Sequence, residues 1–166
     1  MRILLYAVIA LVLVVGVVLA IGAMLPVKHV ATRERLFAAP PDRLYSAISR
    51  VSDYPKWKTG VRAVEEVPAE GGRARFREVG AEKVTYEITE AKSPERFVTR
   101  IADKNLPYGG IWTYELSPAN EGTKLRLTEN GEVYNLFFRF MSKFVFGHYK
   151  TMDSTLDDLQ RYVAGS

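Results

Sequence analysis

The sequence contains no cysteine, and its only two histidines are His29 and His148. Without cysteine the chain has no disulfide framework, no thiol nucleophile and no Cys-ligated zinc or iron–sulfur site. The histidines lie far apart, and no HExxH or paired-Asp motif accompanies them, so we expect no metal site. The GxSxG, Walker and GxGxxG motifs are also missing. Hydrolase-triad and nucleotide-binding functions therefore lack support, and we expect no cofactor.

Charge is absent from one long stretch near the N-terminus, which runs from Ile3 to Leu25. As a helix rising about 1.5 Å per residue, this run is long enough to cross a hydrocarbon core of about 30 Å. The alternative is a cleaved signal peptide beginning at Arg2, although the apolar region of a signal peptide usually has only about 7 to 15 residues. We therefore expect residues 1–27 to be a transmembrane anchor and residues 28–166 to be one domain. The protein would cross a cell membrane once, and the sequence leaves the side of the soluble domain open.

The part of the chain after the anchor carries nearly all of the aromatic residues, the material of a packed interior or a lined cavity. A strand-like run from Val30 to Phe37 precedes a short proline-led helix, which contains Leu44 and Ile48. Further strand-like runs are separated by Gly, Pro and Asn turn signals, which predicts an antiparallel meander. These runs are Val61 to Val67, Arg73 to Val79, Lys83 to Ala91, Arg96 to Ala102, Ile111 to Leu116 and Lys124 to Glu129.

The period of the apolar residues then changes from that of a strand to that of a helix. From about Val133 to Val163 they recur on one helical face, which predicts a single long closing helix. Alternation within the strands places Tyr86, Trp112 and Tyr114 on the apolar face of the sheet. We therefore predict an α+β domain in which the long helix packs on an aromatic sheet face.

Several motifs, in order along the chain, resemble one superfamily. Pro41-Asp42-Arg43-Leu44-Tyr45 and then Val51-Ser52-Asp53-Tyr54-Pro55-Lys56-Trp57 are similar to the opening of the polyketide cyclase/dehydrase and START-like (SRPBCC) superfamily. Trp112-Thr113-Tyr114-Glu115-Leu116 and Thr128-Glu129-Asn130-Gly131-Glu132-Val133 resemble its last two strands. The resemblance covers about residues 30–163. It implies a helix-grip fold, in which a curved antiparallel sheet wraps the C-terminal helix and leaves a cavity. Because that superfamily includes lipid carriers, hormone receptors and aromatic cyclases, the resemblance implies the fold more than the function.

Two titratable residues are candidates for chemistry in such a cavity. Glu129 shares its side of the strand with Leu125 and Leu127, so it would be desolvated and its pKa raised. Alternatively, the strand ends at Thr128, and Glu129 lies at the rim beside a Lys or Arg. His148 falls on the apolar stripe of the closing helix, either as a ligand contact or as a core residue with one hydrogen bond. The predicted ligand-binding residues are Tyr86, Trp112, Tyr114, Glu129, Phe137, Met141, Phe144 and His148, with Glu129 and His148 as the catalytic candidates.

The start of the predicted closing helix has more apolar residues than one packed stripe needs. Phe138, Val145 and Phe146 lie off the stripe of Phe137 and Phe144. This surplus indicates either a surface that enters a lipid interface or gates the cavity, or a surface that neighbouring loops such as Pro107-Tyr108 bury.

Three functions remain open at this stage. The leading hypothesis is a membrane-tethered domain that binds a hydrophobic small molecule or lipid. The second is a cyclase or dehydratase-like enzyme that uses Glu129, His148 and a tyrosine for proton transfer. The third is a non-catalytic interaction module with a filled cavity. The net charge is +4, and the row of Arg73, Arg75 and Arg77 indicates a solvated strand face or contact with anionic headgroups, so we expect a bilayer and no nucleic acid as partner.

Overall fold

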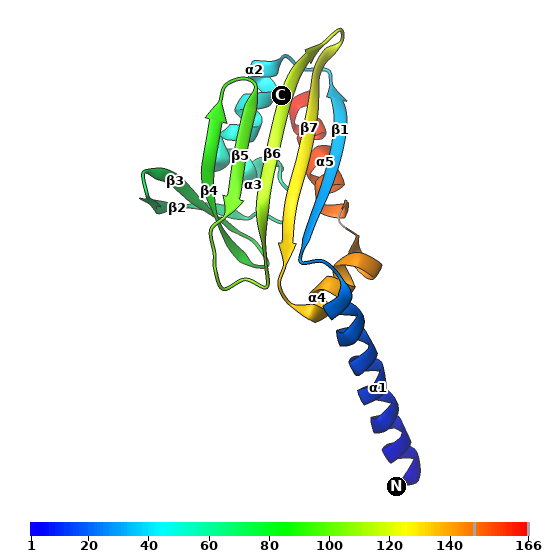
Figure 1. Cartoon of the computed structure of the whole chain (residues 1–166). Helices are drawn as coiled ribbons and strands as arrows, with labels where there is room; N and C mark the ends of the chain where they lie inside the picture. The colour runs from blue at the N-terminus through cyan, green and yellow to red at the C-terminus, as the bar shows by residue number, and fades with distance from the viewer. Residues whose placement is uncertain (148, 166) are drawn as a thin grey trace.

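The computed structural model describes residues 1–147 and 149–165, which form a seven-stranded antiparallel sheet with helices on one face and a projecting N-terminal helix (Figure 1). The strands are β1 (Lys28–Phe37), β2 (Ala63–Glu70), β3 (Arg73–Val79), β4 (Lys83–Lys92), β5 (Arg96–Ile101), β6 (Tyr108–Ala119) and β7 (Gly122–Val133). The helices are α1 (Arg2–Met24), α2 (Pro41–Ser49), the 3-10 turn η1 (Val51–Asp53), α3 (Tyr54–Trp57), α4 (Leu136–Met141), the π-helical segment η2 (Ser142–Phe146) and α5 (Lys150–Ala164).

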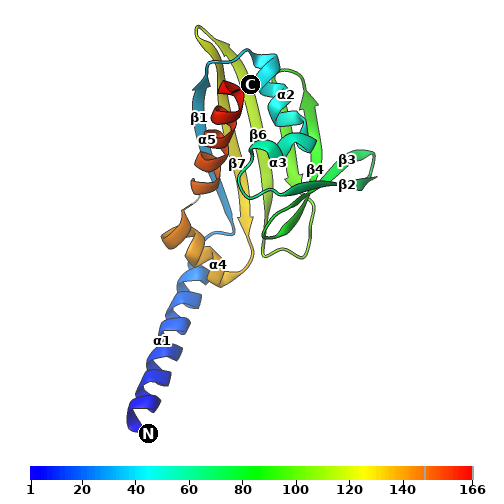
Figure 2. The ribbon, with the colours of Figure 1, turned by 180° about the vertical axis from the view of Figure 1, so that it is seen from behind.

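The strands follow each other as a meander, except that β1 closes the sheet beside the last strand. Their order is β1-β7-β6-β5-β4-β3-β2, and every neighbouring pair is antiparallel. Seen from behind, α5 lies over β1 and β7, whereas α2 and α3 lie over the middle strands (Figure 2). The predicted α+β architecture, with an antiparallel meander and helices on its aromatic face, is therefore confirmed.

The half of the sheet distant from α1 is solidly packed. Met152, Leu156 and Leu159 of α5 are fully buried together with Leu125 and Leu127 of β7. Burying a leucine-sized side chain stabilises a fold by about 1.5 to 3 kcal/mol before entropy is counted, so this cluster is a principal source of stability.

Two ion pairs link α5 to the edge strand β1. Arg33 donates two hydrogen bonds to the carboxylate of Asp153, the shorter measuring 2.8 Å, and Arg35 donates to Asp157 at 2.5 Å. Both arginines come from the inward-facing positions of β1. The helix is therefore held against β1 by charge as well as by apolar packing against β7.

The prediction of one closing helix from Val133 to Val163 was wrong. Strand β7 continues to Val133, and two separate helical pieces follow, α4 with η2 and then α5. They are interrupted at Gly147, whose φ of 70° and ψ of 161° belong to no helix. Both pieces carry apolar residues at helical spacing, but only α5 buries them against the sheet, whereas no residue of α4 is buried.

The first piece packs against α1 instead of the sheet. Gly22 is the buried residue of α1, and a Cβ atom there would lie 2.2 Å from the carbonyl oxygen of Leu136. Arg139 donates to the carbonyl oxygens of Gly22 and Leu25 at 3.4 and 3.3 Å, and to that of Val133 at 2.8 Å. Helix α1 is long and apolar enough to cross a membrane, and none of its most apolar stretch is buried in the domain. It is therefore not a core helix of this domain.

Candidate functional site

A cleft of about 430 Å³ opens between the inner face of strands β3 to β6 and the helices α3 and α5. It occupies the part of the sheet that the packed core does not fill. Its inner wall comes from the sheet and its outer wall from Tyr54 and from Thr151 and Thr155 of α5. The cleft is thus the space between sheet and helix that the resemblance implied.

Aromatic rings form the floor of the cleft. Phe76 of β3 lies opposite Tyr86 of β4, and the two rings stack with their centroids 5.3 Å apart. The rings of Tyr54 and Phe76 lie nearly perpendicular to each other, with their centroids 6.0 Å apart. The Tyr54 hydroxyl donates to the carbonyl oxygen of Ile48 at 2.7 Å. Trp112 and Tyr114 continue this wall on β6. Large flat rings of this kind suit an apolar guest.

The wall also carries hydroxyl groups that the protein leaves available. Burial raises the pKa of both Tyr86 and Tyr114 well above the ordinary value, so each hydroxyl keeps its proton at neutral pH. Within the described part of the chain, neither hydroxyl makes a hydrogen bond to the protein. Each can therefore donate to, or accept from, a polar group of a bound molecule.

An ion pair borders the cleft on the side of α3. Lys58 Nζ donates to Glu78 Oε1 at 2.5 Å, and both side chains are mostly buried. The same ammonium lies 4.9 Å from the ring centroid of Tyr54 and 5.8 Å from that of Tyr86. Sequence analysis missed this pair. The alternation of side chains along β3 could have predicted that Glu78 faces inward, because Glu78 lies on the same strand face as the buried Phe76.

Glu129 lies on the inner face of the sheet, opposite Trp112 on β6 and Ala31 on β1. The strand extends past it, so the alternative in which the strand ends at Thr128 was wrong. Its side chain is 20 % exposed, and Oε1 lies 3.8 Å from Nε2 of His29. Burial raises the pKa of Glu129 to about 7. The carboxyl is therefore poised to exchange a proton near neutral pH, next to the aromatic wall.

The structure brings together only part of the predicted ligand-binding set. Tyr86, Trp112 and Tyr114 line the cleft, and Glu129 lies beside Trp112. Phe137, Met141 and Phe144 do not line it, because they belong to α4 and η2, which turn away toward α1. His148 lies outside the described residues, and so does the side chain of Phe146.

Among the described side chains of α4 and η2, neighbouring loops do not bury the surplus apolar residues. Phe138 is 46 % exposed and Val145 57 % exposed. The alternative in which Pro107-Tyr108 and other loops cover them was therefore wrong.

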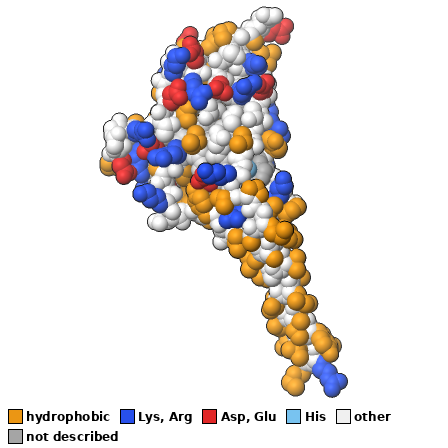
Figure 3. Space-filling model, viewed as in Figure 1, with side chains coloured by type: hydrophobic (Ala, Val, Ile, Leu, Met, Phe, Trp, Pro, Cys, Tyr) orange, Lys and Arg blue, Asp and Glu red, His pale blue; other side chains and the backbone are white. Residues whose placement is uncertain are grey.

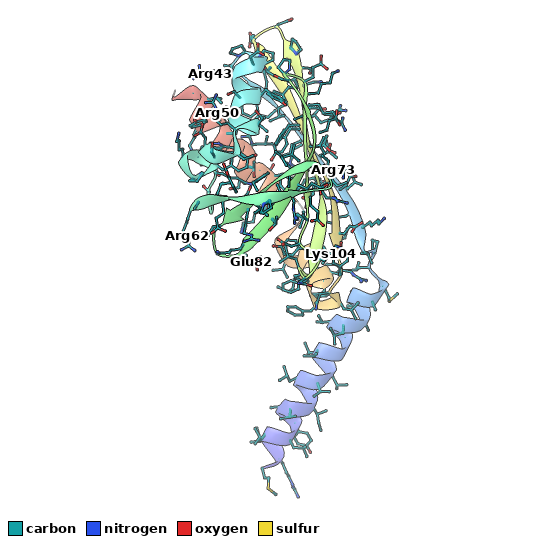
Figure 4. The ribbon with its side chains drawn as sticks, turned by 90° about the vertical axis from the view of Figure 1, so that its left-hand side faces the viewer. Arg43, Arg50, Arg62, Arg73, Glu82 and Lys104 are labelled. Carbon is teal, nitrogen blue, oxygen red and sulfur yellow. The ribbon has the colours of Figure 1, made fainter. Side chains whose placement is uncertain are left out.

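A larger hollow of about 860 Å³ lies on the outer sheet face, but its charges are balanced. Glu87 is buried there and accepts hydrogen bonds from Arg73 at 2.9 Å and Arg100 at 3.2 Å, which lowers the pKa of Glu87. Figure 4 shows Arg73 on the sheet and Lys104 toward the end that carries α1. Arg75 and Arg77 also pair with glutamates, so the arginine row forms part of an ion-paired outer face.

Comparison with known proteins agrees with this architecture. Residues 28–164 match the model of the family described as polyketide cyclase / dehydrase and lipid transport. The chain belongs to this family. Its members' shared fold accounts for the sheet and for α5, whereas α1 precedes the matched region. No curated protein sequence matches the chain.

Solved structures show the same fold at low sequence identity. A protein from Rhizobium leguminosarum is 14% identical with a TM-score of 0.65, over 84% of this chain and 96% of its own. The protein TTHA0849 from Thermus thermophilus is 23% identical with a TM-score of 0.63, over 82% of this chain and 98% of its own. The di-domain ARO/CYC StfQ from the steffimycin biosynthetic pathway is 12% identical with a TM-score of 0.63, over 84% of this chain and 53% of its own.

Proposed function

We propose that this protein is a membrane-tethered binding domain for a hydrophobic small molecule or lipid, which it holds in the cleft between sheet and α5. The observation that carries the proposal is the aromatic wall with two tyrosine hydroxyls that make no hydrogen bond to the described residues. Apolar surface would supply most of the affinity, and Tyr86 and Tyr114 would orient the polar end of the guest. The family description, which includes lipid transport, supports the same ligand class.

The length of α1 supports the tether. Its 23 residues would span about 35 Å as a helix, slightly more than a hydrocarbon core of about 30 Å. With α1 in a bilayer, the domain stays beside a reservoir of apolar molecules. Figure 3 shows the hydrophobic side chains covering α1 and continuing onto the base of the domain.

Extraction of the purified protein tests the binding function. Full-length protein in detergent should release a defined apolar molecule into organic solvent, detectable by mass spectrometry. Val84→Phe places a larger side chain in the cleft, so it should lower the amount released several-fold. Leu36→Phe, on the outer face of β1, is the matched control and should release as much as the wild type. Equal release by both variants, or an empty wild-type protein, would rule out the cleft as a carrier site.

A second function rests on Glu129. Its raised pKa would let it donate a proton to a carbonyl group of a guest held against Trp112, as a cyclase or dehydratase requires. The family description includes both activities. Under this proposal Glu129→Gln still binds the extracted molecule but no longer converts it, whereas under the carrier proposal no product forms with either protein. The open cleft favours these two functions over the third hypothesis, a non-catalytic interaction module with a filled cavity.

A further inference from the structure

The α4–η2 segment, residues 136–146, presents a concentrated apolar surface. Phe137 and Phe138 are 48 % and 46 % exposed, and Phe144 and Val145 are 59 % and 57 % exposed. Beyond α1, most of the large exposed apolar side chains of the described chain lie in this segment or beside it. A soluble surface rarely carries so dense a cluster without a partner.

The segment begins at the point where α1 ends. The backbone of Leu136 lies against Gly22, and Arg139 hydrogen-bonds the last carbonyl oxygens of α1. Gly22 is the twenty-first of the 23 residues of α1, so it comes within about one turn of the helix end. If α1 spans a bilayer, this contact lies close to the boundary between hydrocarbon and headgroups.

The charges around the segment fit the same location. No acidic residue occurs between Glu132 and Asp153, whereas Arg139, Lys143 and Lys150 are basic. Tyr134 and Tyr149 flank the segment and are 48 % and 42 % exposed. Tyrosines beside a membrane-spanning helix favour the headgroup level, and basic residues attract anionic lipid.

We propose that the α4–η2 segment is an interfacial anchor, whose exposed phenylalanines and Val145 insert into the same bilayer that α1 spans. Two contacts with the membrane, one spanning and one lying in its plane, restrict how the domain can tilt. The break at Gly147 then places the start of α5, and with it the cleft residues Thr151 and Thr155, beside the membrane surface. This inference rests on the membrane tether proposed above and not on ligand binding.

The absence of cysteine makes site-directed labelling a direct test. Single variants Phe138→Cys and Val145→Cys of the full-length protein are labelled with an NBD fluorophore and placed, one copy per disc, in nanodiscs of POPC and POPG. Val12→Cys, in the middle of α1, is the control for a label inside the bilayer. Ser117→Cys, exposed at the opposite end of the domain, is the control for a label in water. Depth is measured by quenching with lipids that carry a doxyl group at shallow or deep positions.

The proposal predicts that labels at 138 and 145 are quenched by shallow doxyl groups at least about threefold more than the label at 117, while the label at 12 is quenched by deep ones. Quenching at 12 combined with water-like labels at 138 and 145 would overturn the interfacial anchor and leave the tether intact. An unquenched label at 12 would overturn the tether and this inference with it. Shielding of 138 and 145 that requires two copies in one disc would identify a second chain as the occupant and overturn the proposal as well.

Discussion

At the scale of single residues, Glu129 shows how the alternation of side chains along a strand can bury a carboxyl group and raise its pKa. It faces inward because it shares one face of β7 with Leu125 and Leu127, and β7 runs on past it. Desolvation disfavours the charged form, so the pKa of Glu129 rises to about 7. The Oε1 atom of Glu129 lies 3.8 Å from Nε2 of His29, which is longer than a good hydrogen bond.

This shift predicts a pH dependence of stability. The ordinary pKa of the group is 4.5, so between about pH 4.5 and 7 the folded state holds the proton that the unfolded state has released. The stabilisation of the folded state by the protonated Glu129 carboxyl is therefore fully present below pH 4.5 and is lost as the pH rises through 7. Because the side chain is partly exposed, we expect a loss of about 1 to 2 kcal/mol in the free energy of unfolding.

Glu129→Gln should lack this loss, measured by denaturant unfolding of the full-length protein in detergent at pH 4.5, 6 and 8. Glu132→Gln is the matched control on the same strand, and its profile should follow the wild type. Parallel pH profiles for wild type and Glu129→Gln would contradict the assignment of the shifted group.

At the scale of elements, the interruption between η2 and α5 decides which helix reaches the sheet. A continuous helix would carry α4 and α5 along one line, whereas the break allows α4 to contact α1 and α5 to contact β1 and β7. Gly147 provides the break because its φ of 70° with ψ of 161° is strained for any residue with a Cβ atom.

Gly147→Ala should therefore lower the free energy of unfolding by about 1 to 2 kcal/mol through backbone strain alone. Among the described residues other than its chain neighbours, no heavy atom lies within 4 Å of the position its Cβ would take, so we expect no steric clash to contribute. Gly165→Ala is the control, because Gly165 has a φ of −96° that any residue adopts. Urea unfolding of the two variants compares them, and equal stability would show that the break does not depend on glycine.

At the scale of the whole molecule, one side chain joins α1, the sheet and α4. Arg139 donates to carbonyl oxygens at the end of α1, to Val133 at the end of β7 and to Tyr134 in the link that follows. The last carbonyl groups of a helix have no partner within it, so a guanidinium is well suited to bind them. Arg139 therefore links the end of α1 to the end of β7 and to the start of α4.

Arg139→Met should loosen the junction without unfolding the domain, because the packed core lies at the other end of the sheet. We expect backbone amides of residues 133–140 to exchange hydrogen for deuterium at least about tenfold faster than in wild type, since the lost hydrogen bonds are worth about 1.5 kcal/mol or more together. Lys143→Met, on the same segment, serves as the control and should exchange at the wild-type rate. Unchanged exchange in Arg139→Met would show that the contact between Gly22 and Leu136 holds the junction by itself.

Local sequence pattern was sufficient for the strands and for much of the cleft wall. Alternation in β4 and β6 placed Tyr86, Trp112 and Tyr114 on one face, because side chains of a strand point to opposite sides in turn. The same reasoning applied to β3 would have placed Glu78 inside with Phe76. It could not have found Lys58, which comes from the turn after α3 and meets Glu78 only through the tertiary fold.

The sequence by itself determined the apolar N-terminal helix, the antiparallel meander from β2 to β7 and its aromatic face, because each depends on residues close together in the chain. Only the tertiary structure placed β1 beside β7, which is far from it in the sequence. Only the tertiary structure decided that the final helical region divides, and that its first part packs on α1 while its second part covers the sheet. Helical periodicity reports that a face is apolar, but not whether it is buried or against what. The free space beside Tyr86 and Tyr114 was also decided only by the tertiary structure, since the size of a cleft depends on how far apart the sheet and the helices lie.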